Sequence, residues 1–195
     1  YREKMKKIEF IKMHGLGNDF IIIDKRLNNV EITKDLIKKL SDRKSGVGCD
    51  QFIVMKSSDE ISINAEIEIY NPKGDRAEAC GNGTRCVAKL IFNESNKDEI
   101  RILSDAGVLN AKKINGGSIS INLGELSTNW EQIPLSKKID TFNIPIKIDG
   151  FSNGVAVKIG NPHCIFFGEN INDVDLNYIG PKIENHDLFP NKINV

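Results

Sequence analysis

The sequence predicts a mixed α/β (α+β) protein made of two similar halves. Three observations indicate this fold class: short strand patterns recur along the 195 residues, amphipathic helix patterns interrupt them, and one local pattern occurs twice. Gly17-Asn18, followed by apolar residues 20–23, returns 143 positions later as Gly160-Asn161, followed by residues 164–167. A strand pattern precedes each copy. Such an internal echo indicates two versions of one folding unit.

The first elements expected are two short strands over residues 8–13 and 20–24, with a glycine-bearing turn over residues 14–19 between them. Thr33 is a suitable N-cap for a helix that runs to about Lys44, because a threonine hydroxyl can accept a free N–H of the first turn. These elements place one helix between the early strands of the first half.

The clearest strand pattern covers residues 61–69, where isoleucine and alanine alternate with polar residues. A strong turn signal, residues 71–75, follows it, and a helix is expected from Thr84 to about Phe92. Isoleucine accounts for 29 residues, an excess typical of codon bias, so its abundance alone does not indicate β-structure. The remaining strands of this half are expected at residues 51–55, 100–104, 108–114 and 118–123.

Residues 124–135 are the best candidate for a linker, and we expect a domain over residues 1–124 and a second over residues 125–195. The 27 basic and 27 acidic residues give zero net charge and no electrostatic sign of nucleic-acid binding. No apolar run approaches the roughly 20 residues of a membrane helix, and no signal-peptide core follows the basic start. We therefore expect a cytoplasmic globular protein.

The four cysteines do not form a Cys-x-x-Cys pair, and the three histidines stand apart from one another, so no metal site is expected. A disulfide framework is equally unexpected without a secretion signal. Gly15-Leu16-Gly17 lacks the third glycine of a dinucleotide fingerprint, and a strand pattern follows where a helix should begin. The sequence thus gives no sign of a nucleotide cofactor.

The segment from Ala79 to Cys86 is the best candidate for chemistry. It places Cys80 just before a helix N-terminus, where free N–H groups lower a thiol pKa and bind anions such as a carboxylate. Gly81 and Gly83 allow a ligand to approach the backbone, and Asn82 adds a hydrogen-bonding side chain. The alternative is a glycine-rich turn with a buried cysteine, which is also the simplest interpretation of the other three cysteines.

Several polar side chains at turns and strand ends are further candidates. His163, after Asn161-Pro162, either tunes a thiol or is an ordinary surface histidine. Neutral amides suit recognition of amino and carboxyl groups, but most amides at such positions only stabilise turns. The amides concerned are Asn18, Gln51, Asn71 and Asn161.

Five ordered motifs resemble those of the diaminopimelate epimerase family, and the resemblance extends from about Met5 to the last residues. It implies two α/β halves, each with strands wrapped around a central helix, that face each other across the active site. It also implies interconversion of LL- and meso-diaminopimelate, on the route to lysine and cell-wall precursors, without pyridoxal phosphate, metal or other cofactor. A homodimer is a further expectation. The motifs are residues 14–20, 46–51, 70–74, 79–86 and 160–163.

The resemblance also implies roles for individual residues. Cys80 is one of two catalytic cysteines, which remove and deliver the α-proton on opposite faces of the carbon, and His163 tunes the cysteine pKa values. The residues that match the substrate contacts of the family are Asn18, Gln51, Asn71, Gly81, Asn82, Asn161 and, by a weaker match, Asn194.

One departure from the family pattern affects the expected activity. The second cysteine of the family, in a Cys-Gly-Thr-Gly loop after a Glu-Arg pair, has no match here, so we expect the second half to be truncated. One alternative is therefore a substrate-binding fragment that cannot epimerise. Others are a related racemase or isomerase with another substrate, like those of the proline racemase and phenazine-pathway families, and a cysteine hydrolase that uses Cys80 and His163.

Overall fold

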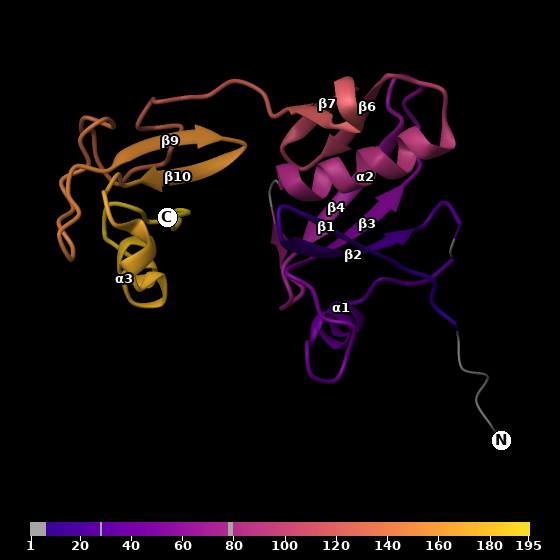
Figure 1. Ribbon diagram of the computed structural model, residues 1–195, viewed down its shortest axis with the longest axis horizontal. Coiled ribbons are helices and arrows are strands. Elements are labelled where there is room, and N and C mark those ends of the chain that lie inside the picture. Colours follow the sequence, from indigo (N-terminus) through magenta and orange to yellow (C-terminus); the bar gives the residue numbers. More distant parts are fainter. Residues whose placement is uncertain (1–6, 28, 78–79) are drawn as a thin grey trace. The chain divides into compact units, whose positions relative to one another are not determined.

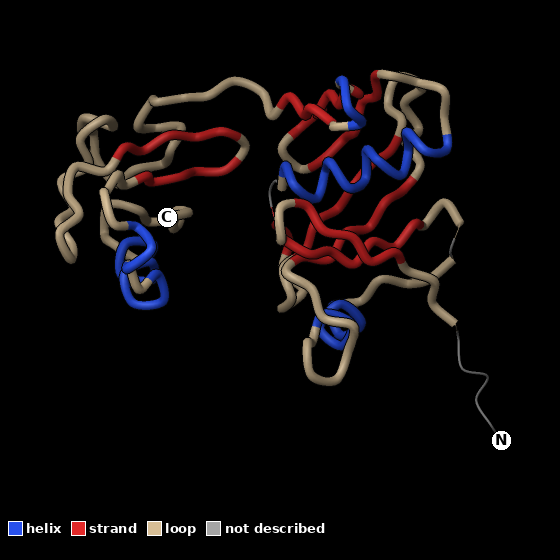
Figure 2. Tube along the Cα trace, viewed as in Figure 1, coloured by secondary structure: helices blue, strands red, loops and turns tan. Residues whose placement is uncertain are grey.

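The computed structural model describes residues 7–27, 29–77 and 80–195. The chain divides into two compact units, Tyr1–Leu123 and Gly124–Val195. Figure 1 labels the elements of each unit, and Figure 2 marks helices, strands and loops along the trace. No helix in the described parts of the chain is both long and apolar enough to cross a membrane.

The described part of the first unit contains one mixed sheet of eight strands. Their order is β1-β2-β3-β4-β6-β7-β8, with β5 paired to β4. The pairs β2–β3 and β4–β6 are parallel, and the others are antiparallel. The strands are β1 (Ile11–Gly15), β2 (Asn18–Asp24), β3 (Gln51–Lys56), β4 (Ala65–Tyr70), β5 (Arg76–Ala77), β6 (Glu99–Ser104), β7 (Gly107–Lys113) and β8 (Ile119–Asn122), and a short 3-10 turn, η1 (Asn115–Gly117), lies between the last two.

The sheet curls around the long helix α2 (Gly81–Glu94) (Figure 1). This helix contacts β1 and β8, the strands at the two ends of the sheet order, as well as β2, β3 and β6 between them. A flat sheet could not bring both end strands to one helix, so the strands wrap the helix as predicted. The helix begins at Gly81, three residues before the predicted start, because Cys80 serves as its N-cap.

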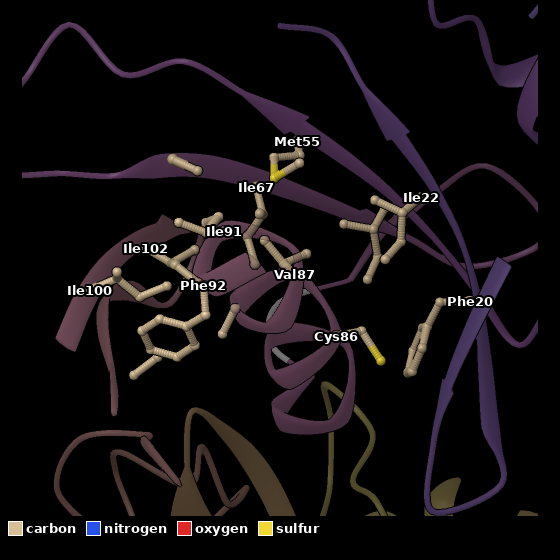
Figure 3. Close-up of a cluster of buried hydrophobic side chains, with 14 of the residues drawn as sticks. Phe20, Ile22, Met55, Ile67, Cys86, Val87, Ile91, Phe92, Ile100 and Ile102 are labelled. Atoms are coloured by element: carbon tan, nitrogen blue, oxygen red, sulfur yellow. The ribbon is translucent and has the colours of Figure 1, made fainter. Parts of the chain in front are cut away.

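The main core lies between α2 and the concave face of the sheet, as Figure 3 shows. The shorter helix α1 (Lys34–Ser41) packs on the other face through Ile37. In β2, Phe20 and Ile22 face the α2 core, whereas Ile21 and Ile23 face the α1 side. Because β2 is covered on both faces, its apolar run is continuous rather than alternating. Each such fully buried side chain stabilises the fold by about 1.5–3 kcal/mol.

Three further predicted boundaries in this unit differ from the structure. The helix α1 has Thr33 as its N-cap but ends at Ser41, because the Asp42 carboxylate accepts the N–H groups of residues 44 and 45 in a local turn. The strand β4 begins at Ala65, and Ile61 is fully exposed in a turn closed by the Ile63 N–H on the carbonyl of residue 60.

The third concerns the first hairpin. The turn between β1 and β2 has two residues instead of the six expected. Leu16 and Gly17 both have positive φ, 54° and 86°, as a type I′ turn requires. This tight turn extends β1 to Gly15 and makes Asn18 the first residue of β2.

The second unit contains the antiparallel pair β9 (Val155–Ile159) and β10 (Asn161–Ile165), a short 3-10 turn η2 (Ile171–Asp173) and helix α3 (Leu176–Glu184). Its core joins residues of these elements to residues well before them, such as Ile133 and Leu135. Both belong to the expected linker over residues 124–135, but they are at most 5% exposed. The end of this segment therefore supplies core residues of the second unit and is not a linker.

Candidate functional site

Cys80 occupies the N-cap of α2 in an extended conformation. Its Sγ accepts a hydrogen bond from the Gly83 N–H at 3.3 Å, and its carbonyl accepts the Thr84 hydroxyl at 2.9 Å. The capping thiol replaces the hydroxyl or carboxylate that usually serves a helix start. The sulfur is therefore fixed at the positive end of a helix of 14 residues.

Cys80 is the one partly exposed cysteine of the four, all of which lie in the described parts of the chain. Burial raises the pKa of its thiol, and the N–H groups of Gly83 and Asn82 and the charge of Arg85 act in the opposite direction. Cys164 is buried, and burial raises its pKa to about 12.

The two glycines of the helix start differ in their surroundings. A Cβ on Gly83 would lie 2.7 Å from Ile53 Cδ1 and 3.3 Å from Phe20 Cε1, so the packing of the helix on the sheet requires glycine there. A Cβ on Gly81 would meet Leu123 at 3.4 Å, an ordinary contact. Packing within the first unit does not explain Gly81, which leaves its backbone open to close approach.

The sheet places Asn18 beside the sulfur. Asn18 Oδ1 lies 3.6 Å from Cys80 Sγ, within the range of a thiol hydrogen bond, and its NH2 group donates to Asp50 Oδ2 at 3.0 Å. Two features position Asn18. It follows the two-residue turn as the first residue of β2, and β2 pairs in parallel with β3.

An ion-pair network holds Asp50 in place. Arg43 donates to Asp50 Oδ1 at 2.7 Å and to both oxygens of Asp19 at 2.6 and 3.1 Å. Lys12 also pairs with Asp19 at 2.7 Å, and the Arg43 guanidinium holds the pKa of the Asp19 carboxyl well below its usual range. Arg43 was not among the sequence candidates, because a lone arginine just after a helix carries no signal of its partners. Asp50 lies inside the motif of residues 46–51, but no property of the residue itself indicates a contact with Asn18.

The other amides of the first unit have different surroundings. Gln51 begins β3, and its Oε1 is buried with no hydrogen-bond partner among the described residues. Asn71 Oδ1 accepts the N–H groups of Lys73 and Asp75, so this oxygen stabilises the turn and only the NH2 group is left for a ligand. Asn82 Oδ1 accepts a hydrogen bond from Arg85, one turn along α2.

The second unit brings together the other three candidates. His163 Nε2 lies 2.8 Å from Asn161 Oδ1, and because an amide oxygen only accepts, Nε2 carries the proton. Burial lowers the pKa of His163. The backbone of Asn194 pairs with β10 through the Cys164 N–H (2.7 Å) and the Pro162 carbonyl (3.0 Å). His163 and Asn194 also line one largely apolar cavity of about 450 Å³.

The structure therefore joins Asn18 to Cys80 in one unit and Asn161, Asn194 and His163 in the other. Among the described residues, no group of three or more His, Cys, Asp or Glu side chains could hold a metal ion. What the first unit offers chemically is a thiol at a helix N-terminus, beside an amide of fixed orientation and an open glycine backbone.

Solved structures with a similar fold include a probable racemase and a predicted epimerase. A probable proline racemase from Agrobacterium radiobacter matches with a TM-score of 0.60 and 12% identity, over 92% of this chain and 55% of that one. A predicted epimerase from Pseudomonas aeruginosa matches with a TM-score of 0.55 and 12% identity, over 90% and 67%. The chain thus shares the fold of these proteins, as predicted.

The sequence comparisons identify the family. The family model described as "Diaminopimelate epimerase" matches residues 10–128. The diaminopimelate epimerase of Pelagibacter ubique is 47% identical over 96% of this chain and 69% of its own length. That of Sphingopyxis alaskensis is 41% identical over 95% and 66%. The chain belongs to the diaminopimelate epimerase family, which confirms the predicted family and its enzyme class, an epimerase. It spans about two thirds of the length of these curated relatives.

Proposed function

We propose that Cys80 exchanges a proton with the α-carbon of diaminopimelate, as one of the two acid–base cysteines of an epimerase. The observation that carries this proposal is the placement of the one partly exposed thiol at the N-cap of α2, with its Sγ on the Gly83 N–H. A thiol at that position can alternate between thiol and thiolate, as a general acid–base must.

The step is a simple proton transfer. The Cys80 thiolate removes the α-proton, an S–H bond forms, and the C–H electron pair stays on the carbon beside the carboxylate. Inversion requires an acid on the opposite face that protonates this carbanion. None of Cys49, Cys86 and Cys164 can serve from its buried position, so in this proposal the second acid is not among the cysteines of this sequence.

The α-carboxylate of the substrate would lie at the N-terminus of α2, against the backbone of Gly81 and Asn82. Backbone N–H groups at a helix start bind anions and stabilise the charge that develops next to the carbanion. Asn71 would act as a donor through its NH2 group, since its oxygen is used in the turn. Asn18 and Gln51 would complete the contacts of the first unit.

In the second unit, Asn161 and Asn194 are proposed as further substrate contacts and His163 as the residue that tunes the thiols. With Nε2–H on Asn161, a neutral His163 presents Nδ1 as an acceptor. A homodimer, a cytoplasmic location and a role in lysine and cell-wall precursor synthesis are also part of this proposal, by family membership.

The test is α-proton exchange in deuterium oxide. The chain is incubated with LL-diaminopimelate, and deuterium at the α-carbon and the configuration are followed by NMR and chiral chromatography. We expect deuterium incorporation that falls at least about 10³-fold in Cys80→Ala, because the thiol is the group that moves the proton. Formation of the meso isomer by the 195-residue chain would contradict the need for a second acid outside its cysteines.

Cys86→Ala is the matched control, since Cys86 lies on the same helix but is buried in the core. This variant should be less stable but should keep the exchange rate per folded molecule. L-Proline and other amino acids serve as alternative substrates. Faster exchange with any of them, or exchange that persists in Cys80→Ala, would overturn the proposal.

A further inference from the structure

The carboxamide of Asn18 lies between a carboxylate, which can only accept a hydrogen bond, and a thiol, which can donate one. On one side is Asp50 Oδ2, 3.0 Å from Asn18 Nδ2, and on the other is Cys80 Sγ, 3.6 Å from Asn18 Oδ1. A carboxylate has no hydrogen to donate, so it can bond only the NH2 end of the amide. The oxygen end must then face the sulfur.

The orientation of Asp50 is itself fixed. Its Oδ1 accepts from Arg43 at 2.7 Å, and its Oδ2 also accepts the backbone N–H of Asp19 at 2.9 Å. The Asp50 N–H donates in turn to the Asp19 carboxylate and carbonyl, both at 2.9 Å. The carboxylate is thus hydrogen-bonded at both oxygens, one of them to a guanidinium.

We propose that Asp50, held by Arg43, is a positioning residue that turns the oxygen of Asn18 toward Cys80 and thereby holds this cysteine as a thiol when no substrate is bound. A thiol can donate to the Asn18 oxygen and accept from the Gly83 N–H, which is the arrangement observed at Sγ. A thiolate would face the negative end of the amide. The catalytic role of Cys80 rests on the proposed function. The protonation state of this residue does not, because it can be measured without any substrate.

Other charges near the sulfur act differently. Arg85, on the same helix, favours the thiolate, and the neighbouring thiol on that helix is Cys86. Neither contacts Asn18 in any hydrogen bond of the described residues. The orientation of the amide is therefore the part of the environment that Asp50 controls.

The decisive variant is Asp50→Ala. Without the carboxylate, nothing holds the NH2 group of Asn18 away from the sulfur, so the Asn18 amide is free to turn over. An NH2 group would then face the sulfur and stabilise the thiolate. We expect the pKa of Cys80 to fall, and its alkylation by iodoacetamide at pH 7, followed by peptide mass spectrometry, to become about 3- to 10-fold faster.

The swapped pair Asn18→Asp with Asp50→Asn predicts the opposite sign. A carboxylate at position 18 would accept from the amide at position 50 and would face the sulfur with an oxygen. Alkylation should then be slower than in the original chain. Asp98→Ala is the matched control, because Asp98 is an exposed carboxylate of the same unit whose ion pair is with Lys113. It should leave the alkylation rate unchanged.

Unchanged or slower alkylation in Asp50→Ala, or faster alkylation in the swapped pair, would overturn the proposal. Alkylation of the buried Cys86 would reveal unfolding of a variant. If a variant unfolds, a measurement on the unaltered chain still tests the proposal. NMR should show short proton–proton distances between the Asn18 NH2 group and the Asp19 N–H, since both groups donate to Asp50 Oδ2. Contacts from those protons to the Cys80 Hβ protons instead would overturn it. Failure of α-proton exchange, in contrast, would leave these results intact and count only against the proposed function.

Discussion

The hairpins β1–β2 and β9–β10 carry the two halves of the internal echo, and their asparagines have different neighbours. Asn18 and Asn161 each begin the second strand of an antiparallel pair after a glycine with positive φ. Asn18 is fixed by a carboxylate and faces a thiol, whereas Asn161 faces the imidazole of His163. The same Gly-Asn pair thus opens the second strand of both hairpins, although two residues separate the paired ends of the first hairpin and one separates those of the second. The elements packed around each asparagine determine the chemistry.

The surroundings of the hairpins differ as well. In the first unit, β2 is an interior strand of the eight-stranded sheet and is covered on both faces. In the second, β9 and β10 form a two-stranded sheet, and one core cluster includes Cys164 of β10. We therefore expect substitutions under the first hairpin to lower the free energy of unfolding more than substitutions in the second unit do.

The largest effect is expected from Gly83→Ala, which places a Cβ 2.7 Å from Ile53 Cδ1 in a fully buried region. Because Ile53 and Phe20 are both fully buried and would have to shift to make room for the new methyl group, the first unit should lose about 1–3 kcal/mol of unfolding free energy. This loss is measured by urea unfolding, with amide hydrogen exchange of α2 as the readout.

Gly180→Ala in α3 is the matched change in the second unit. A Cβ there meets nothing within 4 Å beyond its chain neighbours, but the ring of the following Pro181 disfavours a helical residue with a Cβ before it. The gain in helix propensity should therefore be largely offset, and the unfolding free energy of that unit should change by less than about 0.5 kcal/mol. Trp130, the one tryptophan of the chain, packs on the second core and reports its unfolding by fluorescence. A loss from Gly180→Ala as large as that from Gly83→Ala would contradict the difference in packing.

The sequence allowed prediction of the helix and of Cys80 before its start, because helix periodicity and glycine placement are local signals. The wrapping of the strands around that helix was implied by the family resemblance alone. The sequence did not allow prediction of Asn18 beside the thiol or of Arg43 behind it. Those contacts depend on the parallel pairing of β2 with β3, which no local pattern encodes. Ile61 was assigned to a strand for the opposite reason, since a chain rich in isoleucine mimics strand alternation where the backbone turns.

The two units should also respond differently to acid. Burial lowers the pKa of His163 below its usual 6.5, so the unfolded chain binds the proton more readily. The second unit should lose stability as the pH falls through about 6.5 and level off once the folded histidine is protonated. In the first unit, Arg43 lowers the pKa of Asp19 below 3.8, so that contribution is complete at pH 5 and is lost only as the pH falls below about 4.

Urea unfolding at pH 7, 6 and 5 checks this difference, with Trp130 fluorescence for the second unit and hydrogen exchange of β2 for the first. His163→Gln keeps a donor for Asn161 but does not titrate, so it should flatten the pH dependence of the second unit alone. A wild-type second unit with the same stability at pH 7 and pH 5 would refute the histidine argument.

The smallest effect expected is at the turn of the first hairpin. Leu16 is 91% exposed and has a φ of 54°, a conformation that costs a leucine more than an asparagine. Leu16→Asn creates the Asn-Gly pair that type I′ turns favour, and it should stabilise the first unit by about 0.5–1 kcal/mol. The β9–β10 turn offers no such gain, because its Gly160 already has a φ of 73° and Gly160→Ala should destabilise the second unit. Changes of opposite sign in the unfolding free energy, measured in urea, would show that the two hairpins differ in turn strain as well as in the residues around them. No gain from Leu16→Asn would mean that the neighbouring strands alone fix the first turn.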